Sequence, residues 1–299
     1  MDFRLNHFGL VCQDLDRSLA VYRDQLAHQV TARWYNRDYL DIAFLGAGCD
    51  VTIELVGQPH LDYEQAHIAR HGYSINHMSF QVKDARAAFA ELKSRGVEVA
   101  WEPMQVMTML QCGFRDPDGL LFEVYSDLDP ALPLAVPDQS QPPQPADLRM
   151  HHISILTPEL RRSQRFYVEK MGLKTVYEYV KDDGGFVFLA DPYYDAAQHD
   201  FLLEIIGPPH LEPREVLLLE ERGACYDHLC YVADDVHAAW QACLDRGAQN
   251  MTPPAKELGM WIAWLNDADD NDVEIMNPIP AEIVEEAVRT GQPVDGLAL

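Results

Sequence analysis

The chain of 299 residues has few basic side chains for its size. It contains 23 Lys and Arg against 48 Asp and Glu, which gives a formal net charge of −25 at pH 7. Because such a surface repels phosphate backbones and anionic lipid headgroups, we expect no nucleic-acid partner and no membrane partner. The same negative field attracts cations, so it is compatible with a divalent metal.

Long apolar runs and paired cysteines are also missing. No stretch approaches the roughly 18 apolar residues that a membrane-spanning helix needs, and the opening MDFRLNHFGL lacks a signal-peptide pattern. The six cysteines are scattered and form no Cys-x-x-Cys pair. We therefore expect reduced thiols in a cytoplasmic protein.

What the sequence does contain is an internal repeat. Three collinear pairs of segments match: residues 5–22 with 150–167, 53–61 with 203–211, and 75–99 with 226–250. Similar spacing over three segments indicates one architecture used twice.

The repeat defines the domain organisation. We predict a first domain at residues 1–128 and a second at 149–280, which agrees with a prior of about 150 residues per domain. Residues 129–148 between them are rich in proline and glutamine and are predicted to be a linker. The last residues, 281–299, are predicted to form an acidic C-terminal helix or tail.

Each half contains a finer repeat. A short alternating strand (NHFGLV in the first half) leads into an amphipathic helix (DLDRSLAVYRDQL) and then into further strands ending in DVTIELV. A second strand, helix and strand set follows and ends in GLLFEVY. Because the apolar period switches from 2 to about 3.6 and back, each unit is predicted to be βαβββ, and four units give an α+β fold.

A histidine marks the first strand of each unit and a glutamate the last. All eight lie in apolar, strand-like runs, where an ionised carboxylate needs compensation. A divalent cation supplies it, and imidazole with carboxylate suits Fe(II), Mn, Co, Ni or Zn. The predicted metal ligands are His7, Glu54, His77 and Glu123 in the first half and His152, Glu204, His228 and Glu274 in the second.

These motifs resemble the vicinal oxygen chelate superfamily, which includes glyoxalase I, methylmalonyl-CoA epimerase, fosfomycin-resistance proteins and extradiol dioxygenases. The segments that carry the resemblance are the His-bearing strands with their helices and FRDPDGLLFEVY, which Glu123 closes. The resemblance implies four βαβββ modules paired into two domains, each a cupped mixed sheet around a metal site. It also implies a small-molecule substrate that offers two neighbouring oxygens to the metal.

The resemblance allows a non-redox enzyme, which we take as the first hypothesis. Glyoxalase I and the epimerase use four protein ligands, one of them a carboxylate or amide on the fourth strand of the first module. Glu54 and Glu204 occupy that place. By this analogy Glu123 or Glu274 acts as the catalytic base while the metal stabilises an enediolate. The turns after Glu54 and Glu204, LVGQPH and IIGPPH, lack the Asn of glutathione-dependent glyoxalases, so we expect another substrate.

The alternative hypothesis is an Fe(II) extradiol dioxygenase of a catechol-like ring. Two His and one Glu of the C-terminal domain suffice there, and His152, His228 and Glu274 fill those places. His199 in QHDFLLEI resembles a further catalytic His of that family. The family's Tyr and Asp-Pro-x-Gly turn are replaced here by Trp264 and DADD, whereas the first half keeps DPDG at 116–119.

A third hypothesis is a non-catalytic small-molecule binding protein, although such members usually lack the metal ligands. The sequence leaves open the metal, the substrate and whether the chain pairs with a second copy as a homodimer. His67 and His71, four residues apart in EQAHIARHG, have a spacing that can clamp zinc, but no third ligand is nearby. They are therefore predicted to lie on a solvated helix face.

Overall fold

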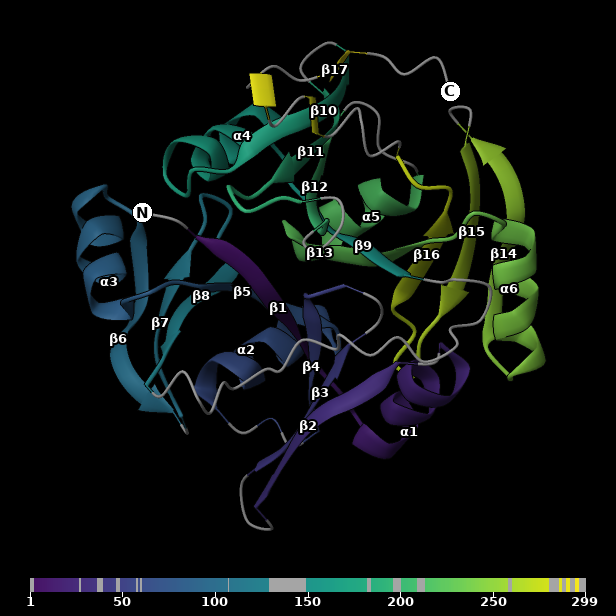
Figure 1. Cartoon of the computed structure of the whole chain (residues 1–299), viewed down its shortest axis with the longest axis horizontal. Coiled ribbons are helices and arrows are strands. Elements are labelled where there is room, and N and C mark those ends of the chain that lie inside the picture. The colour runs from purple at the N-terminus through teal and green to yellow at the C-terminus, as the bar shows by residue number, and fades with distance from the viewer. Residues whose placement is uncertain are drawn as a thin grey trace.

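Figure 1 shows the computed structural model of the chain. It describes residues 3–26, 28–36, 40–46, 49–57, 59, 61–106, 108–128, 149–181, 184–195, 200–208, 213–257, 260–279, 285–286, 289–290 and 294–295. The predicted linker at 129–148 lies outside these residues.

The first half forms one mixed sheet of eight strands in the order β2-β3-β4-β1-β5-β8-β7-β6. Its two modules meet where β1 and β5 pair antiparallel, while β1–β4 and β5–β8 pair parallel. The strands are β1 (Arg4–Val11), β2 (Gln29–Asn36), β3 (Leu40–Gly46), β4 (Thr52–Val56), β5 (Ile75–Gln81), β6 (Glu98–Val106), β7 (Met109–Arg115) and β8 (Leu121–Asp127).

The second half repeats this topology in the order β14-β15-β16-β13-β9-β12-β11-β10, and a short ninth strand, β17, pairs with β10. The equivalent central pair is β9 with β13. The strands are β9 (Arg149–Leu156), β10 (Lys174–Lys181), β11 (Gly184–Ala190), β12 (Leu202–Gly207), β13 (Cys225–Val232), β14 (Gln249–Glu257), β15 (Met260–Asn266), β16 (Asp272–Met276) and β17 (Val294–Asp295). In the predicted tail, residues 285–286 and 289–290 are helical.

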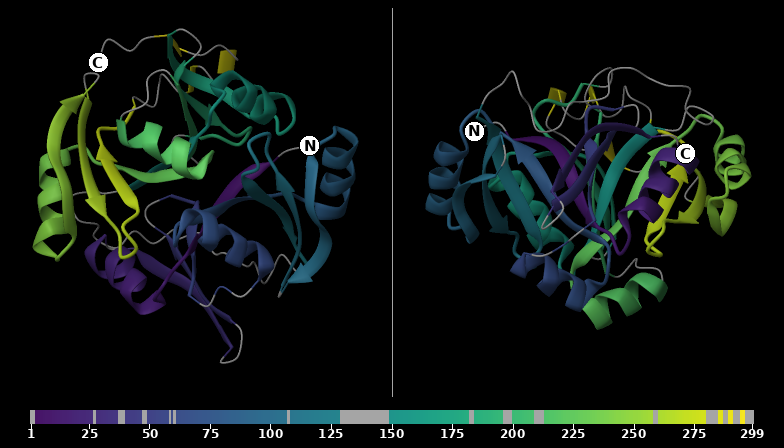
Figure 2. Two further views of the ribbon diagram at one scale, coloured as in Figure 1. Left: turned by 180° about the vertical axis from the view of Figure 1, so that it is seen from behind. Right: turned by 90° about the horizontal axis from the view of Figure 1, so that it is seen from below.

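One helix follows the first strand of every module, which confirms the α+β fold of four βαβββ units. These helices are α1 (Leu15–Leu19) with the π-helical turn η1 (Ala20–Gln25), α3 (Ala85–Ser94), α4 (Leu160–Glu169) and α6 (Val236–Asp245). Three of them begin at an aspartate, Asp14, Asp84 or Asp235, whose carboxylate accepts hydrogen bonds from first-turn N–H groups. Two more helices, α2 (Asp62–His71) and α5 (Pro213–Arg222), join the modules of each half and lie side by side (Figure 2).

Alternation along the strands separates two apolar regions. On β1, Phe8 and Leu10 enter a large core that contains residues of both halves, whereas Val11 joins a smaller cluster on the opposite face. Across the large core the rings of Phe8 and Phe201 stack with centroids 6.0 Å apart. The two halves therefore share one core, and the opposite face of each sheet is left for the site.

Reciprocal hydrogen bonds join the halves around this core. Tyr22 donates to the Asp267 carboxylate at 2.9 Å, and Tyr167, its equivalent in the repeat, donates to the Asp116 carboxylate at 3.0 Å. Figure 1 shows α1 of the first half against the β15–β16 end of the second. The DPDG and DADD turns thus receive the first helix of the other half, so the DPDG sequence does not itself mark the first half as the active one.

Asp116 should make stability depend on pH. Burial, reinforced by the charge of Asp118, raises its pKa to about 7 from 3.8. Its contribution to the free energy of unfolding is therefore complete below pH 3.8 and is lost as the pH rises through 7. Asp116→Asn cannot ionise, so relative to wild type it should gain on the order of 2–4 kcal/mol between pH 4 and pH 8, measured by urea unfolding. The exposed Asp16→Asn is the control, and a pH-independent difference for Asp116→Asn would refute the assignment.

Candidate metal centres

The first predicted quartet converges at the centre of the first sheet. His7, Glu54, His77 and Glu123 lie on β1, β4, β5 and β8, which are the four adjacent central strands, and all four are buried. Nε2 of His7 lies 3.1 Å from a Glu123 oxygen and 3.8 Å from a Glu54 oxygen. Nε2 of His77 lies 3.3 Å from Glu54 and 3.9 Å from Glu123. Four donors from four strands therefore face one point.

The second quartet repeats this arrangement on β9, β12, β13 and β16. Nε2 of His152 lies 3.3 Å from Glu204 and 3.4 Å from Glu274, and Nε2 of His228 lies 3.4 Å from each glutamate. The two Nε2 atoms are 3.2 Å apart. Each quartet is assembled within one half of the chain, so neither needs a strand from a partner.

Each of these histidines is held by the residue just before it. Nδ1 of His7 lies 3.0 Å from Asn6 Oδ1, Nδ1 of His77 lies 3.1 Å from Asn76 Oδ1, and Nδ1 of His228 lies 2.8 Å from Asp227 Oδ2. Such partners keep the proton on Nδ1 and leave the Nε2 lone pair for a metal. The sequence signal that could have found them is a polar residue before each histidine in an apolar strand.

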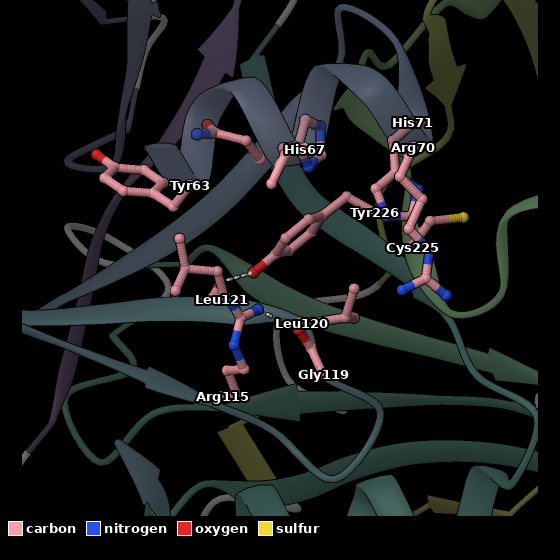
Figure 3. Close-up of a pocket in the computed structure, with 12 residues that line it drawn as sticks. Tyr63, His67, Arg70, His71, Arg115, Gly119, Leu120, Leu121, Cys225 and Tyr226 are labelled. Atoms are coloured by element: carbon pink, nitrogen blue, oxygen red, sulfur yellow. Dashed lines mark hydrogen bonds between the residues drawn. The ribbon is translucent and has the colours of Figure 1, made fainter. Parts of the chain in front are cut away.

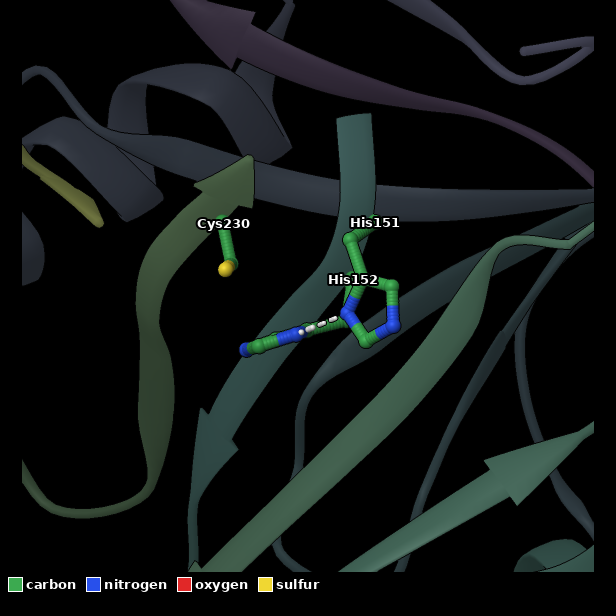
Figure 4. A group of neighbouring side chains, drawn as sticks. All are labelled: His151, His152 and Cys230. Atoms are coloured by element: carbon green, nitrogen blue, oxygen red, sulfur yellow. Dashed lines mark hydrogen bonds between the residues drawn. The ribbon is translucent and has the colours of Figure 1, made fainter. Parts of the chain in front are cut away.

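His152 has a histidine as its partner instead. Its Nδ1 lies 2.9 Å from Nδ1 of His151, and burial lowers the pKa of His151 well below its usual value. A neutral His151 can accept the His152 proton, which again leaves Nε2 free. Donor atoms of His151, His152 and Cys230 lie within 4.8 Å of one another (Figure 4). Because His152 Nε2 is directed at the glutamates, we interpret this trio as support for the second quartet.

The last glutamate of each quartet has a positioning partner two residues beyond the second histidine. Ser79 donates to Glu123 at 2.7 Å. Its equivalent in the second half is Cys230, whose thiol lies beside Glu274 and helps to lower the pKa of that carboxyl. Serine in one half and cysteine in the other are therefore one chemical difference around the two glutamates.

Charges within the quartets balance one another despite burial. Burial opposes ionisation of Glu123, but pairing with His7 and the charge of His77 lower its pKa to about 2. Burial likewise opposes protonation of His228, but Asp227 and Glu274 raise its pKa well above 6.5. A divalent ion would replace these protons as the positive charge between the carboxylates.

The donor set fits such an ion. Nε2 of His7 and Nε2 of His77 are buried, and neither makes a hydrogen bond within the described residues. Both nitrogens instead lie close to carboxylate oxygens, at 3.1 Å from Glu123 and 3.3 Å from Glu54, and an ion between these atoms would bind both kinds of donor. Two imidazoles and two carboxylates suit the borderline divalent metals, so the residues present match the group that was predicted from sequence.

Aromatic rings surround both quartets, but they come from different positions. His7 contacts the rings of Phe44 and Tyr125, with centroids 5.5 and 5.6 Å away. His152 and His228 contact Phe188 and Trp264, at 5.0 and 5.1 Å. Trp264 pairs with Glu274 across β15 and β16. At the equivalent position of the first half, Gly113 pairs with Glu123 across β7 and β8, so no ring comes from that position.

Gly113 leaves room for a ring from the neighbouring strand. A Cβ at Gly113 would lie 2.3 Å from the Trp101 indole, which stacks on Tyr63 of α2 with centroids 5.0 Å apart. The walls of the two centres therefore differ in shape, so we expect the two centres to accept substrates of different shape.

Glycine is also required beside the first quartet itself. Gly9 pairs with His77 across β1 and β5, and a Cβ at Gly9 would lie 2.1 Å from His77 Cε1. The imidazole therefore occupies the space that any other side chain would need. The equivalent residue in the second half is Ser154, so the second quartet tolerates a Cβ at this position.

Two other sequence predictions have different outcomes. His199, the proposed additional catalytic residue, lies outside the described residues. His67 and His71 are not on a freely solvated face as predicted: both line a cavity, and burial lowers their pKa values to about 3 and about 4. Both residues do lie on a helix, α2, but Cys225 and Tyr226 of the other half lie across the cavity from this face.

Comparison with known proteins identifies the family. The model of the Glyoxalase/Bleomycin resistance protein/Dioxygenase superfamily matches residues 4–124 and 149–275, so the chain belongs to this superfamily. Members include metal-dependent enzymes, as the relatives below illustrate. Among the described residues no helix is both long enough and apolar enough to cross a membrane.

Two curated relatives share modest identity. A lactoylglutathione lyase of Schizosaccharomyces pombe is 26% identical over 92% of this chain and 96% of its own length. The uncharacterized protein YwkD of Bacillus subtilis is 28% identical over 40% of this chain and 94% of its own length.

Solved structures share the fold at lower identity. A mutant 4-hydroxymandelate synthase from Streptomyces coelicolor is 16% identical with a TM-score of 0.66, covering 92% of both chains. A Mn(II)-bound glyoxalase from Novosphingobium aromaticivorans is 18% identical with a TM-score of 0.60, covering 92% of this chain and 81% of that one. The 2,3-dioxygenase LapB from Pseudomonas sp. KL28 is 14% identical with a TM-score of 0.61, covering 98% and 96%.

Proposed function

We propose that the chain is a divalent-metal-dependent enzyme that isomerises, epimerises or cleaves a substrate with two vicinal oxygens. The observation that carries this proposal is the fourth donor of each quartet. Glu54 and Glu204 lie 3.3 Å from the nearest imidazole Nε2, although two histidines and one glutamate would suffice for an Fe(II) dioxygenase. The similarity to a lactoylglutathione lyase supports the same class of chemistry.

In this proposal the chain's own residues bind the ion and move the proton. His7, Glu54 and His77 would hold the ion in the first half, and His152, Glu204 and His228 would hold it in the second. When bound, the ion supplies Lewis-acid polarisation of the two substrate oxygens. Glu123 and Glu274 would take a proton from substrate carbon and return it, because a carboxylate that leaves the ion can act as a general base.

The surroundings of Glu123 suit that role. Ser79 donates to one carboxylate oxygen and orients the group, while Phe44 and Tyr125 exclude water from one side of the centre. Excluding water strengthens the electrostatic interactions that hold a developing charge. In the second half Cys230, Phe188 and Trp264 would play the same parts.

The substrate is proposed to be something other than a glutathione conjugate, because the turns after Glu54 and Glu204 lack the Asn of glutathione-dependent members. The hemithioacetal of methylglyoxal and glutathione should therefore be converted far more slowly than the best compound from a panel of α-hydroxy ketones and 2-oxo acid derivatives. Efficient turnover of the hemithioacetal would instead place the chain with the glutathione-dependent enzymes.

Metal identity and oxygen use test the proposed class. Protein purified without oxygen and without an affinity-column metal should contain about two non-iron divalent ions per chain, measured by plasma mass spectrometry. It should consume no O₂ with catechols in an oxygen-electrode assay. About one iron per chain with catechol-dependent O₂ uptake would establish the extradiol alternative, and a metal-free chain would favour a binding protein.

A further inference from the structure

A cavity of about 380 Å³ lies between the two halves, and none of the eight quartet residues is part of its lining (Figure 3). Helix α2 covers it, the β7–β8 turn forms its floor, and the first residues of β13 close it from the other half. The lining residues used below are Asn76, Arg70, Arg115, Leu120, Leu121 and Tyr226.

The charge of this cavity is opposite to that of the chain. Of the described residues, no Asp or Glu lines it, whereas Arg70 and Arg115 do, in a protein with a formal net charge of −25. Its two histidines, His67 and His71, are neutral at pH 7 because burial lowers their pKa values. The positive potential therefore comes from guanidinium groups, which match carboxylates well.

A buried hydrogen-bond donor in this lining has no partner. Asn76 is 3% exposed, and its Nδ2 makes no hydrogen bond within the described residues. Its Oδ1 faces His77 Nδ1. If Nε2 of His77 is kept for a metal, Nδ1 must carry the proton, so the oxygen of Asn76 has to face His77. The amide nitrogen is then left for an acceptor in the cavity.

The remaining surfaces are apolar. The Tyr226 hydroxyl already donates to Leu121 O at 2.6 Å and accepts from Met78 N at 3.0 Å. Tyr226 therefore offers its apolar ring, and not its hydroxyl, to a ligand in the cavity. Leu120 and Leu121 add aliphatic surface. Arg70 and Arg115 each donate one hydrogen bond to a backbone carbonyl, at 2.9 and 2.8 Å. Nε of Arg115 also lies 3.9 Å from a carboxylate oxygen of the exposed Glu98, and further N–H groups remain on each guanidinium.

We propose that this cavity binds a small organic carboxylate with an apolar body. Asn76 Nδ2 and a guanidinium would receive the carboxylate, and Tyr226 and the leucines would contact the body. A ligand there would also touch the residue that orients His77, so its binding and metal binding at the first quartet would be coupled reciprocally. The second half lacks such a donor because Asp227 replaces Asn76.

Benzoate serves as the probe, titrated calorimetrically into the whole Mn²⁺-loaded chain. Wild type should bind benzoate in the millimolar range or tighter and bind the neutral analogue benzamide at least about tenfold more weakly. Asn76→Asp should weaken benzoate at least about tenfold, because it replaces the donor by an anion while keeping the acceptor for His77. Mn²⁺ content is measured in each variant, and benzoate affinities are compared at saturating Mn²⁺.

Asn6→Asp is the matched control, because Asn6 supports His7 of the same quartet and does not line the cavity; its benzoate affinity should equal that of wild type. Arg115→Gln should weaken benzoate about fivefold or more and provides a second test if Asn76→Asp does not fold. Benzoate that merely coordinates Mn²⁺ would bind Asn76→Asp and Arg115→Gln as well as wild type. That result, or equal affinity for benzamide, would overturn the proposal, whether or not the enzyme activity is established.

Discussion

A chain carrying both Glu123→Gln and Glu274→Gln should lose turnover by about 10²- to 10⁴-fold, the usual contribution of a general base. Glutamine keeps the size of the side chain and an acceptor oxygen but cannot take a proton. Each single variant should retain the activity of the other quartet. Comparing the two single variants therefore shows how much of the turnover each half contributes. The measurement is steady-state turnover of the best panel substrate at saturating metal.

Metal content separates this effect from loss of the ion. Under the same conditions each single variant should lower the metal affinity of its own quartet only. If the double variant, supplied with excess metal, turned over substrate at the wild-type rate, the assignment of Glu123 and Glu274 as bases would be wrong. Loss of all activity in only one single variant would mean that the other quartet is structural.

Gly9→Ala should remove metal from the first quartet while the second keeps its ion. The added Cβ would lie 2.1 Å from His77 Cε1 and 2.4 Å from Nδ1, far inside contact distance, so the ring must leave its position. We expect at least about a 100-fold loss of metal affinity at the first site, because an imidazole ligand is displaced. Overpacking should also destabilise the fold by about 1–3 kcal/mol.

Ser154 provides the matched control, because it occupies the equivalent position beside the second quartet. Ser154→Ala keeps the Cβ that this half already accommodates, so both quartets should retain their ions. Competition titrations with a chromophoric chelator would resolve the two affinities. If both quartets of the Gly9→Ala variant bound metal with the wild-type affinity, the first sheet would have to move to accept the methyl group, and the prediction would be wrong.

Most of the fold could be predicted from the repeat and the apolar periods. The period assigns His7 and Val11 to one face of β1 and Phe8 to the other, and the same phase recurs around His152. Equal spacing in the two halves then places each His and Glu at matching points of a sheet. The eight candidate residues could be named for this reason, because they depend on local alternation and not on distant packing.

Contacts between the halves could not be predicted in the same way. The roles of Asp116 and Tyr167 depend on how two apolar faces dock, and they are 51 residues apart in the chain. The same applies to His67 and His71, whose helix face is covered by the other half. The support of His77 by Asn76 was missed for a different reason: adjacent residues on a regular strand point to opposite faces, and the β1–β5 pairing is irregular close to this point.

The reciprocal Tyr–Asp contacts carry an evolutionary consequence. Tyr22 reaches Asp267 and Tyr167 reaches Asp116, so each half presents one donor and one acceptor in equivalent places. Two identical halves related by a twofold axis would satisfy the same two bonds. The present chain has the form expected if a self-pairing ancestor fused with its own copy. In a fused chain each half can carry its own substitutions, such as Ser79 against Cys230 and Asn76 against Asp227.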